Sequence, residues 1–281
     1  MRIRRKLLVL AASSIAVLAT AAAGLAITNG QPDGDNHPYV GLAVFDVLVN
    51  GQHQPSHRCS ASLLSPTVVL TAGHCTIGTS RARVWFDEVV QGNPEYPFSG
   101  ATSYDGVAHT NPAFCNPCAP GLPGFALGDV GIIVLTEPVP TTAVSEYADL
   151  PGAGLVDTLK NKTGIDFVGY GVQFQQKIPG NALPQPPPFF RWAGPRVRLF
   201  APSELVSGKF THSAQVMKLA LNASGGSGGT CFGDSGGPDL LAGTDTVLAV
   251  NSYVTNINCS GVGYSSRVDT AGVLAWINSF L

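Results

Sequence analysis

The chain has 281 residues, 44% of them hydrophobic, and a formal net charge of −2 at pH 7. This length suffices for two small domains or one large domain. Because acidic residues outnumber basic ones, the chain lacks the positive surface that neutralises phosphates, and we expect no nucleic-acid partner.

The first 26 residues have the pattern of a secretory signal peptide. Basic residues lie within the first six positions, an apolar stretch follows from 7 to 23, and small residues stand at Gly24 and Ala26. A membrane-anchoring helix is the alternative, but hydroxyl residues and an alanine run make the stretch weakly apolar for spanning a bilayer. We therefore expect cleavage after Ala26, export to the extracellular space, and no membrane contact afterwards.

Short β-type runs bounded by Gly, Pro, Asn or Ser recur along the chain. Many such runs without a sustained helical period predict an all-β fold, a barrel or a sandwich, and not alternating strands and helices. Glycine and proline interrupt the pattern near residues 150–162, which suggests domains over 27–150 and 151–281. The predicted strands cover residues 39–45, 67–71, 83–86, 130–135, 166–170, 196–200, 216–221 and 246–250.

One helix is predicted at the C-terminus, over residues 269–281. Asp269 is placed to cap its first turn, and an apolar stripe at helical spacing consists of Val273, Trp276, Ile277 and Phe280. The polar face carries no cluster of Lys or Arg, so we expect the helix to pack on the protein and not on a membrane.

Six cysteines follow the export signal, and their even number fits three disulfides in an oxidising compartment. The composition alone leaves every pairing scheme open. The cysteines are Cys59, Cys75, Cys115, Cys118, Cys231 and Cys259.

Two segments carry candidate catalytic residues: TAGHC at residues 71–75 and GDSGGP at residues 233–238. A serine hydroxyl is a poor nucleophile at neutral pH unless a base such as histidine takes its proton. The spacing around Ser235 also fits the nucleophile turn of α/β-hydrolases, but those enzymes need a histidine after the serine. All six histidines precede Ser235, which excludes that class.

His74 and Asp129 are the candidate partners of Ser235. His74 follows an apolar strand and precedes a cysteine, which favours catalysis over a purely structural histidine. Several other aspartates lie between His74 and Ser235, but Asp129 heads a continuous apolar strand, as a buried carboxylate that orients an imidazole should.

The order His, Asp, Ser resembles that of the chymotrypsin/trypsin-like serine peptidases, from Ile27 to the C-terminus. The resemblance rests on TAGHC, on GDVGIIVL at 128–135, on CFGDSGGP at 231–238 and on ITNG at 27–30. It implies an all-β fold of two six-stranded antiparallel β-barrels packed together, with a C-terminal α-helix. It also implies a secreted serine endopeptidase in which His74 is the general base and acid, Asp129 orients it, and Ser235 forms the acyl-enzyme.

The resemblance assigns further roles around Ser235. The backbone N–H groups of Gly233 and Ser235 would form the oxyanion hole, because glycines at 233 and 236 let the backbone turn sharply. Asp234 would pair with the free α-amino group of Ile27, which signal cleavage itself would release without a separate propeptide.

The resemblance also implies the disulfides Cys59–Cys75 and Cys231–Cys259, which leaves Cys115 and Cys118. A C-x-x-C pair can be half of a zinc site or a redox dithiol, but no second pair remains to complete a tetrahedral site. We therefore expect a third disulfide, no metal and no organic cofactor.

The expected specificity pocket contains Gly229, Ser252, Tyr253, Val254 and Gly263. Trypsin-like members carry an aspartate at the position of Gly229, so cleavage after Arg or Lys is not expected here. Val254 replaces a glycine of chymotrypsin-like enzymes and would favour small or medium apolar side chains. Ser252 matches the family serine that hydrogen-bonds to the triad carboxylate.

The expected partner is a protein or peptide substrate, and we expect a monomer. Two other functions stay open on the sequence. The chain could be a catalytically inactive peptidase homologue that acts as a binding protein, or an esterase that uses the same triad on non-peptide substrates.

Overall fold

The computed structural model describes residue 27 and residues 30–116, 126–171, 196–206, 215–222, 228–256 and 259–281. The predicted signal peptide and Cys118 lie outside these ranges, so export and the Cys115–Cys118 bridge stay predictions. Among the described residues, no helix is long and apolar enough to cross a bilayer.

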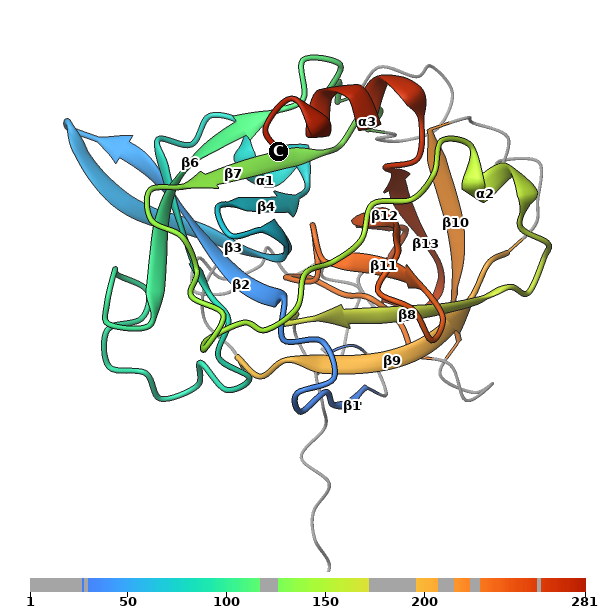
Figure 1. The fold of residues 1–281 in the computed structure, drawn as a ribbon, viewed down its shortest axis with the longest axis horizontal. Helices are drawn as coiled ribbons and strands as arrows, with labels where there is room; N and C mark the ends of the chain where they lie inside the picture. Colours follow the sequence, from blue (N-terminus) through green and yellow to red (C-terminus); the bar gives the residue numbers. More distant parts are fainter. Residues whose placement is uncertain are drawn as a thin grey trace, which may run out of the picture.

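Six antiparallel strands of the first half close into a barrel, on the left of Figure 1. Their order is β2-β3-β4-β7-β6-β5, and the pairing of β2 with β5 completes the ring. β2 begins with six apolar residues in succession, and these residues and the following Asp46 are all buried. The strands are β2 (Val40–Val49), β3 (Gln52–Ser65), β4 (Val68–Thr71), β5 (Arg81–Trp85), β6 (Ser103–Thr110) and β7 (Gly131–Leu135).

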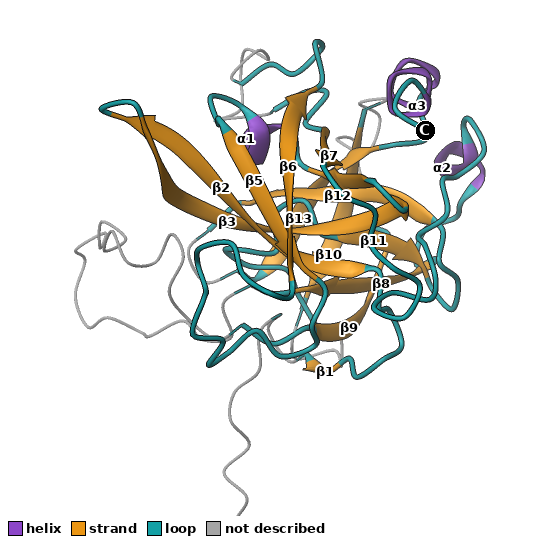
Figure 2. Cartoon of the chain, turned by 60° about the vertical axis from the view of Figure 1, so that its left-hand side comes forward, coloured by secondary structure: helices purple, strands orange, loops and turns teal. Residues whose placement is uncertain are grey.

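The second half forms a curled antiparallel sheet in the order β1-β9-β8-β11-β12-β13-β10 (Figure 2). A bridge between Leu205 and Leu219 joins its far ends, so six strands curl into a second barrel and the short β1 is added beside β9. The strands are β1 (Gln31–Pro32), β8 (Gly164–Gly169), β9 (Leu199–Glu204), β10 (Val216–Leu221), β11 (Pro238–Leu241), β12 (Val247–Val254) and β13 (Gly261–Arg267).

All eight predicted strands have a counterpart, although their ends differ by a few residues. The sequence did not predict β1, β3, β6, β11 and β13. β3 mixes apolar residues with buried polar ones such as Arg58 and Ser60, and β6 is mostly half-buried. Such strands lack a clear apolar alternation, because pairing with neighbours on both sides stabilises them.

The described chain also contains three helices: α1 (Gly73–Thr76), α2 (Leu155–Thr158) and α3 (Ala271–Asn278). The C-terminal helix is confirmed, but its predicted cap is wrong. Thr270 occupies the N-cap position of α3 without a side-chain hydrogen bond. Asp269 instead accepts hydrogen bonds from Arg267 and from the backbone N–H of Val156, because a buried carboxylate needs a close cation.

Helix α3 extends from the second barrel and packs across the first one, above β7 in Figure 1. Val273 and Ile277 join the same buried cluster as the residues of the first barrel. The Phe280 ring lies 5.1 Å from the ring of His109 on β6. The apolar stripe of α3 therefore joins the two halves of the chain. This agrees with the expectation that the C-terminal helix packs on the protein.

Two apolar clusters form the interior. The larger one fills the first barrel and continues into the contact with the second, where it includes Val168, Tyr170 and Val250. The smaller one fills the second barrel and includes Ile27 and Phe167. The predicted fold of two packed antiparallel β-barrels with a C-terminal helix is confirmed.

Candidate active site

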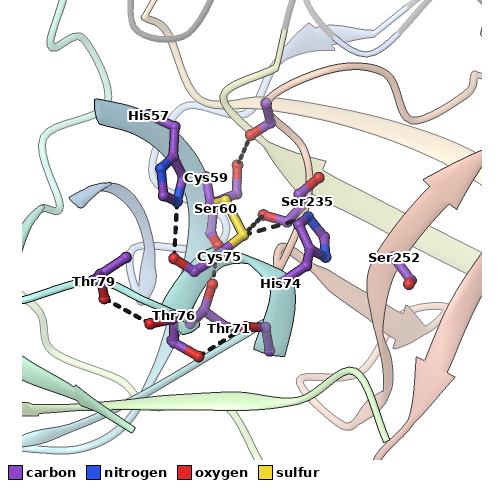
Figure 3. Close-up of a disulfide and its surroundings, with 12 residues drawn as sticks. His57, Cys59, Ser60, Thr71, His74, Cys75, Thr76, Thr79, Ser235 and Ser252 are labelled. Atoms are coloured by element: carbon purple, nitrogen blue, oxygen red, sulfur yellow. Dashed lines mark hydrogen bonds between the residues drawn. A yellow bond between two sulfur atoms is a disulfide. The ribbon is translucent and has the colours of Figure 1, made fainter. Parts of the chain in front are cut away.

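His74 lies on α1, directly after the buried strand β4. A disulfide between Cys59 on β3 and Cys75 ties this turn to the first barrel (Figure 3). The backbone N–H of His74 donates to Oδ1 of Asp129 at 2.7 Å, and its Nδ1 lies 2.8 Å from Oδ2. The imidazole is therefore oriented through both its backbone and its ring.

Asp129 stands directly before β7, and its side chain is fully buried. The hydroxyl of Ser252, on β12 of the second barrel, donates to its Oδ2. Burial by itself would raise the pKa of Asp129, but the charge of His74 and the hydrogen bonds from His74 and Ser252 lower it below its ordinary value. The site thus keeps a carboxylate ionised beside the imidazole.

Ser235 lies in the tight loop that precedes β11, where Gly233 and Gly236 have positive φ angles of 98° and 78°. Such angles are unfavourable for residues with a side chain. Ser60 on β3 donates its backbone N–H to the Ser235 carbonyl at 2.8 Å and its hydroxyl to the Gly233 carbonyl at 3.0 Å. The first barrel therefore fixes the loop that carries the serine.

Ser235 and His74 line the same pocket, and Figure 3 shows both beside the Cys59–Cys75 disulfide. Nε2 of His74 lies 3.6 Å from Sγ of Cys75. Among the described residues, no hydrogen bond joins Nε2 to the Ser235 hydroxyl. Catalytic hydrogen bonds are often long in free enzymes and tighten when substrate binds, so this geometry is compatible with a catalytic pair.

Asp234 is fully buried directly before Ser235. Its carboxylate accepts hydrogen bonds from the backbone N–H groups of Gly171 and Cys231, both at 2.8 Å. Burial raises the pKa of Asp234 to about 7, against the opposing effect of these donors and of Arg58. Ile27 is buried in the second cluster, and no hydrogen bond joins it to Asp234 in this arrangement of the described residues.

The pocket beside Ser235 has a volume of about 250 Å³. Of the residues expected in the specificity pocket, Ser252, Tyr253 and Val254 line it, whereas Gly229 and Gly263 are not among its described lining residues. Gly263 pairs with Val254 across β12 and β13, so it lies behind the wall. The lining residues are His74, Thr230, Cys231, Phe232, Ser235, Asn251, Ser252, Tyr253 and Val254.

The family model for trypsin matches residues 35–186, more than half of the chain. The chain belongs to the trypsin family. Chymotrypsin-like elastase family member 3B of Macaca mulatta is 28% identical to this chain over 209 residues. The match covers 73% of this chain and 74% of the elastase. Proproteinase E of Bos taurus is 27% identical over 218 residues, with 73% and 76% covered. Together these matches identify a chymotrypsin-like serine peptidase fold and family.

Two solved structures share this fold. A structure of HL collagenase has a TM-score of 0.64 at 18% identity and covers 89% of this chain and 96% of its own. A mutant of human heparin binding protein has a TM-score of 0.58 at 16% identity, with 89% and 95% covered. At these identities the likeness shows the fold alone.

Two of the predicted disulfides of this trypsin-family chain are present. Cys59 pairs with Cys75, and Cys231 pairs with Cys259, which ties the loop of Ser235 to the segment after β12. The Cys59, Cys75 and His74 side chains form the one group of potential metal ligands found in the described ranges. Its two sulfur atoms are bonded to each other, so they are not available as thiolates.

Sequence reasoning missed three residues of the pocket: Thr230, Phe232 and Asn251. Phe232 lies inside the motif CFGDSGGP, and Thr230 directly precedes this motif, so both could have been found from it. Asn251 precedes Ser252 on β12, where alternation would place the two side chains on opposite faces. The register of β12 against β13 shifts between Asn251 and Tyr253, which lets both side chains line the pocket.

Proposed function

We propose that this chain is a secreted serine endopeptidase that hydrolyses peptide bonds through His74, Asp129 and Ser235. The observation that carries the proposal is the buried Asp129, which holds His74 by two hydrogen bonds beside Ser235 in one pocket. If Asp129 and His74 formed a purely structural pair, neither a serine nor an open pocket would be needed next to the imidazole of His74.

The reaction follows from the positions of these groups. His74 takes the proton of the Ser235 hydroxyl as its oxygen attacks the carbonyl carbon of the scissile bond. The imidazolium that forms is stabilised by the ionised Asp129, whose lowered pKa keeps it charged. His74 then gives the proton to the departing amine, which leaves an acyl-enzyme on Ser235, and water activated by His74 releases the acid.

The oxyanion of the tetrahedral intermediate would accept hydrogen bonds from the backbone N–H groups of Gly233 and Ser235. Each such donor typically contributes about 3 kcal/mol to transition-state stabilisation. The positive φ of Gly233 supports this role, because it sets the direction of the N–H groups in this turn. A released α-amino group at Ile27 would pair with Asp234 and stabilise the same loop.

The pocket supports a preference for uncharged side chains before the scissile bond. The described residues that line it include no carboxylate, so an Arg or Lys side chain would be buried among them without a counter-ion. Tyr253 and Val254 line the pocket, and the Tyr253 ring stacks on the ring of Tyr264 with centroids 5.0 Å apart. Small or medium apolar side chains therefore fit best.

We propose that residues 1–26 are removed during export, that the mature protein is an extracellular monomer, and that the two barrels correspond to domains over 27–150 and 151–281. Protein or peptide is the substrate, without metal or organic cofactor. N-terminal sequencing of the secreted active protein tests the first point, and a start other than Ile27 would contradict it.

Covalent labelling of Ser235 tests the catalytic assignment. The secreted protein is treated with a fluorophosphonate probe, and the labelled peptide is located by mass spectrometry. We expect label on Ser235, and we expect its loss in Ser235→Ala and a large decrease in His74→Ala. A native serine that stays unlabelled in folded protein would support the binding-protein alternative instead.

A panel of peptide substrates that differ only in the residue before the scissile bond tests the specificity. We expect the highest kcat/KM for small and medium apolar residues such as Ala, Val and Leu. Preferential cleavage after Arg or Lys would contradict this assignment, and hydrolysis of esters without any peptide hydrolysis would favour the esterase alternative.

A further inference from the structure

The side chain of Ser60 lies against the loop that carries Ser235 (Figure 3). Ser60 is on β3 directly after Cys59, and it is fully buried. Its hydroxyl donates to the carbonyl oxygen of Gly233 at 3.0 Å and accepts the backbone N–H of Tyr170 at 2.9 Å. A serine hydroxyl has a single proton, so this hydroxyl donates to Gly233 alone.

The backbone group that donates to Ser60 is itself held in place. Tyr170 directly follows β8 and is fully buried, and its own hydroxyl donates to the carbonyl oxygen of Asp87 at 2.8 Å. A Cβ atom placed on the neighbouring Gly169 would lie 3.0 Å from Oγ of Ser60, so this segment packs closely against the hydroxyl. The N–H of Tyr170 therefore orients the Ser60 hydroxyl, whose proton then faces Gly233.

The backbone of Ser60 connects the same loop to the segment that carries His74. Its N–H donates to the Ser235 carbonyl oxygen at 2.8 Å, and its carbonyl oxygen accepts the Thr71 hydroxyl at 2.9 Å. Thr71 ends β4, three residues before His74. Hydrogen bonds thus join this one residue to the end of β4, to the end of β8 and to the serine loop.

The hydroxyl of Ser60 acts on the loop residue whose conformation is least restrained. Gly233 has a φ of 98° and no side chain, so sterics leave its two backbone dihedrals loosely defined. Only these two dihedrals separate its N–H from its carbonyl. Within the described part of the chain, the N–H groups of Gly233 and Ser235 donate to no acceptor. The direction of the Gly233 N–H therefore depends on how its carbonyl is anchored.

We propose that the Ser60 hydroxyl is a positioning group for the oxyanion hole: it holds the Gly233 carbonyl and thereby directs the Gly233 N–H toward the oxygen of the tetrahedral intermediate. The inference rests on the proposed peptidase function and adds to it a residue outside the triad. Donors aimed in advance at a developing charge stabilise the transition state more than the bound substrate. Removal of the hydroxyl should therefore lower kcat and leave KM nearly unchanged.

Ser60→Ala and Ser62→Ala form a matched pair for the test. Ser62 lies two residues further along β3 and is also fully buried, but its hydroxyl has no hydrogen-bond partner among the described residues. Ser60→Ala removes the donor to Gly233 and the acceptor of Tyr170, and it keeps the backbone N–H that donates to Ser235. The two variants delete the same atom and differ in the hydrogen bonds that are lost.

Two kinetic measurements are made on the secreted protein, and circular dichroism monitors folding. The first gives kcat and KM for one apolar peptide substrate. The second compares kcat/KM for an oxygen ester and for the matching thionoester, in which sulfur replaces the carbonyl oxygen. Sulfur is a weak hydrogen-bond acceptor and gains less from N–H donors. Because both esters use the same triad, the ratio of their rates reports on the oxyanion hole.

For Ser60→Ala we expect kcat to decrease roughly 10- to 50-fold, with KM within about twofold of the native value. Loss of a complete oxyanion donor typically costs about 100- to 1,000-fold, and in this variant the donor remains but is less well aimed. The preference for the oxygen ester over the thionoester should decrease in the same variant. Ser62→Ala should keep the native kcat and the native preference.

Two outcomes would overturn the inference while leaving the peptidase function intact. In one, folded Ser60→Ala keeps the native ratio of ester to thionoester rates, because damage to the triad or to stability acts on both substrates alike. In the other, Ser60→Ala and Ser62→Ala show equal decreases. If Ser60→Ala does not fold, Ser60→Gly replaces it and is judged by the same ratio. Absence of all hydrolysis by the native protein would instead contradict the proposed function itself.

Discussion

Asp129 illustrates how much of this site depends on single atoms. One oxygen accepts the backbone N–H of His74, and the other faces both the imidazole and the Ser252 hydroxyl. Hydrogen bonds to a charged acceptor typically contribute about 1.5–3 kcal/mol each. Because the donors come from both barrels, the orientation of His74 depends on contacts made by residues that are far apart in the chain.

Ser252→Ala tests this dependence. Removal of the hydroxyl takes one hydrogen bond from the ionised Asp129, so its pKa should rise and the imidazole should be less well oriented. We expect kcat/KM to decrease roughly 10- to 100-fold, which corresponds to one charge-assisted hydrogen bond. Ser266→Ala is the control, since Ser266 is also buried on the neighbouring strand β13 but forms no hydrogen bond with Asp129. Equal kinetics for Ser252→Ala and native protein would contradict the assignment.

At the scale of the elements, β11 places an acidic residue, Asp239, in the interior of the second barrel. Asp239 pairs with Phe167 on β8 and with Ala249 on β12, and it is fully buried. Neither carboxylate oxygen meets hydrogen-bond geometry within the described residues, although the Ser265 hydroxyl is close enough to oppose part of the pKa change. Burial raises the pKa of Asp239 well above its ordinary value, so the strand holds a neutral carboxyl group.

Asp239→Asn should therefore stabilise the protein near neutral pH. The folded protein keeps a proton on Asp239 that the unfolded chain loses above about pH 4, so the stability due to the neutral carboxyl is lost as pH rises. Asparagine does not ionise, and its advantage should grow by up to about 1.4 kcal/mol per pH unit above that point. Urea unfolding between pH 4 and pH 8 measures the difference. Glu137→Gln, at an exposed position, should show no such trend, and parallel pH profiles for Asp239→Asn and native protein would refute the argument.

At the scale of the whole molecule, the two barrels meet where the loop of Ser235 contacts β3 and β4. The smallest clearance lies at Gly236. A Cβ atom there would collide with the Thr71 hydroxyl and would lie 2.6 Å from the Ser60 carbonyl oxygen and 2.7 Å from the Ala72 nitrogen. Backbone atoms cannot move aside without separating the barrels. The glycine is therefore required both by its positive φ and by the approach of the first barrel.

Gly236→Ala should destabilise the protein and reduce its activity, and Gly243→Ala supplies a matched control. Both glycines have a positive φ, 78° and 74°, but nothing lies within 4 Å of a Cβ atom at Gly243. We expect a loss of about 1 kcal/mol for Gly243→Ala from backbone strain alone, and at least about 3 kcal/mol for Gly236→Ala from strain and collision together. Equal free energies of unfolding for the two variants would contradict the close contact between Gly236 and the first barrel.

The sequence predicted those parts of the molecule that local chemistry specifies. Apolar runs indicated eight strands, because their residues are buried along most of their length. Among the five unpredicted strands, β3 contains polar residues whose burial depends on partners elsewhere, such as Arg58 and Ser60. Asp269 was predicted to cap α3, but it binds Arg267 instead, because a buried cation outweighs a helix cap.

By itself, the sequence determined which side chains could perform nucleophilic chemistry. The motifs around His74 and Ser235 are contiguous, and their order in the chain excluded one class of hydrolase. Only the tertiary structure decided that Asn251 lines the pocket and that Ser60 fixes the serine loop. The physical reason is distance along the chain: these contacts join residues on different strands or barrels, and no local pattern records which strands the folded core brings together.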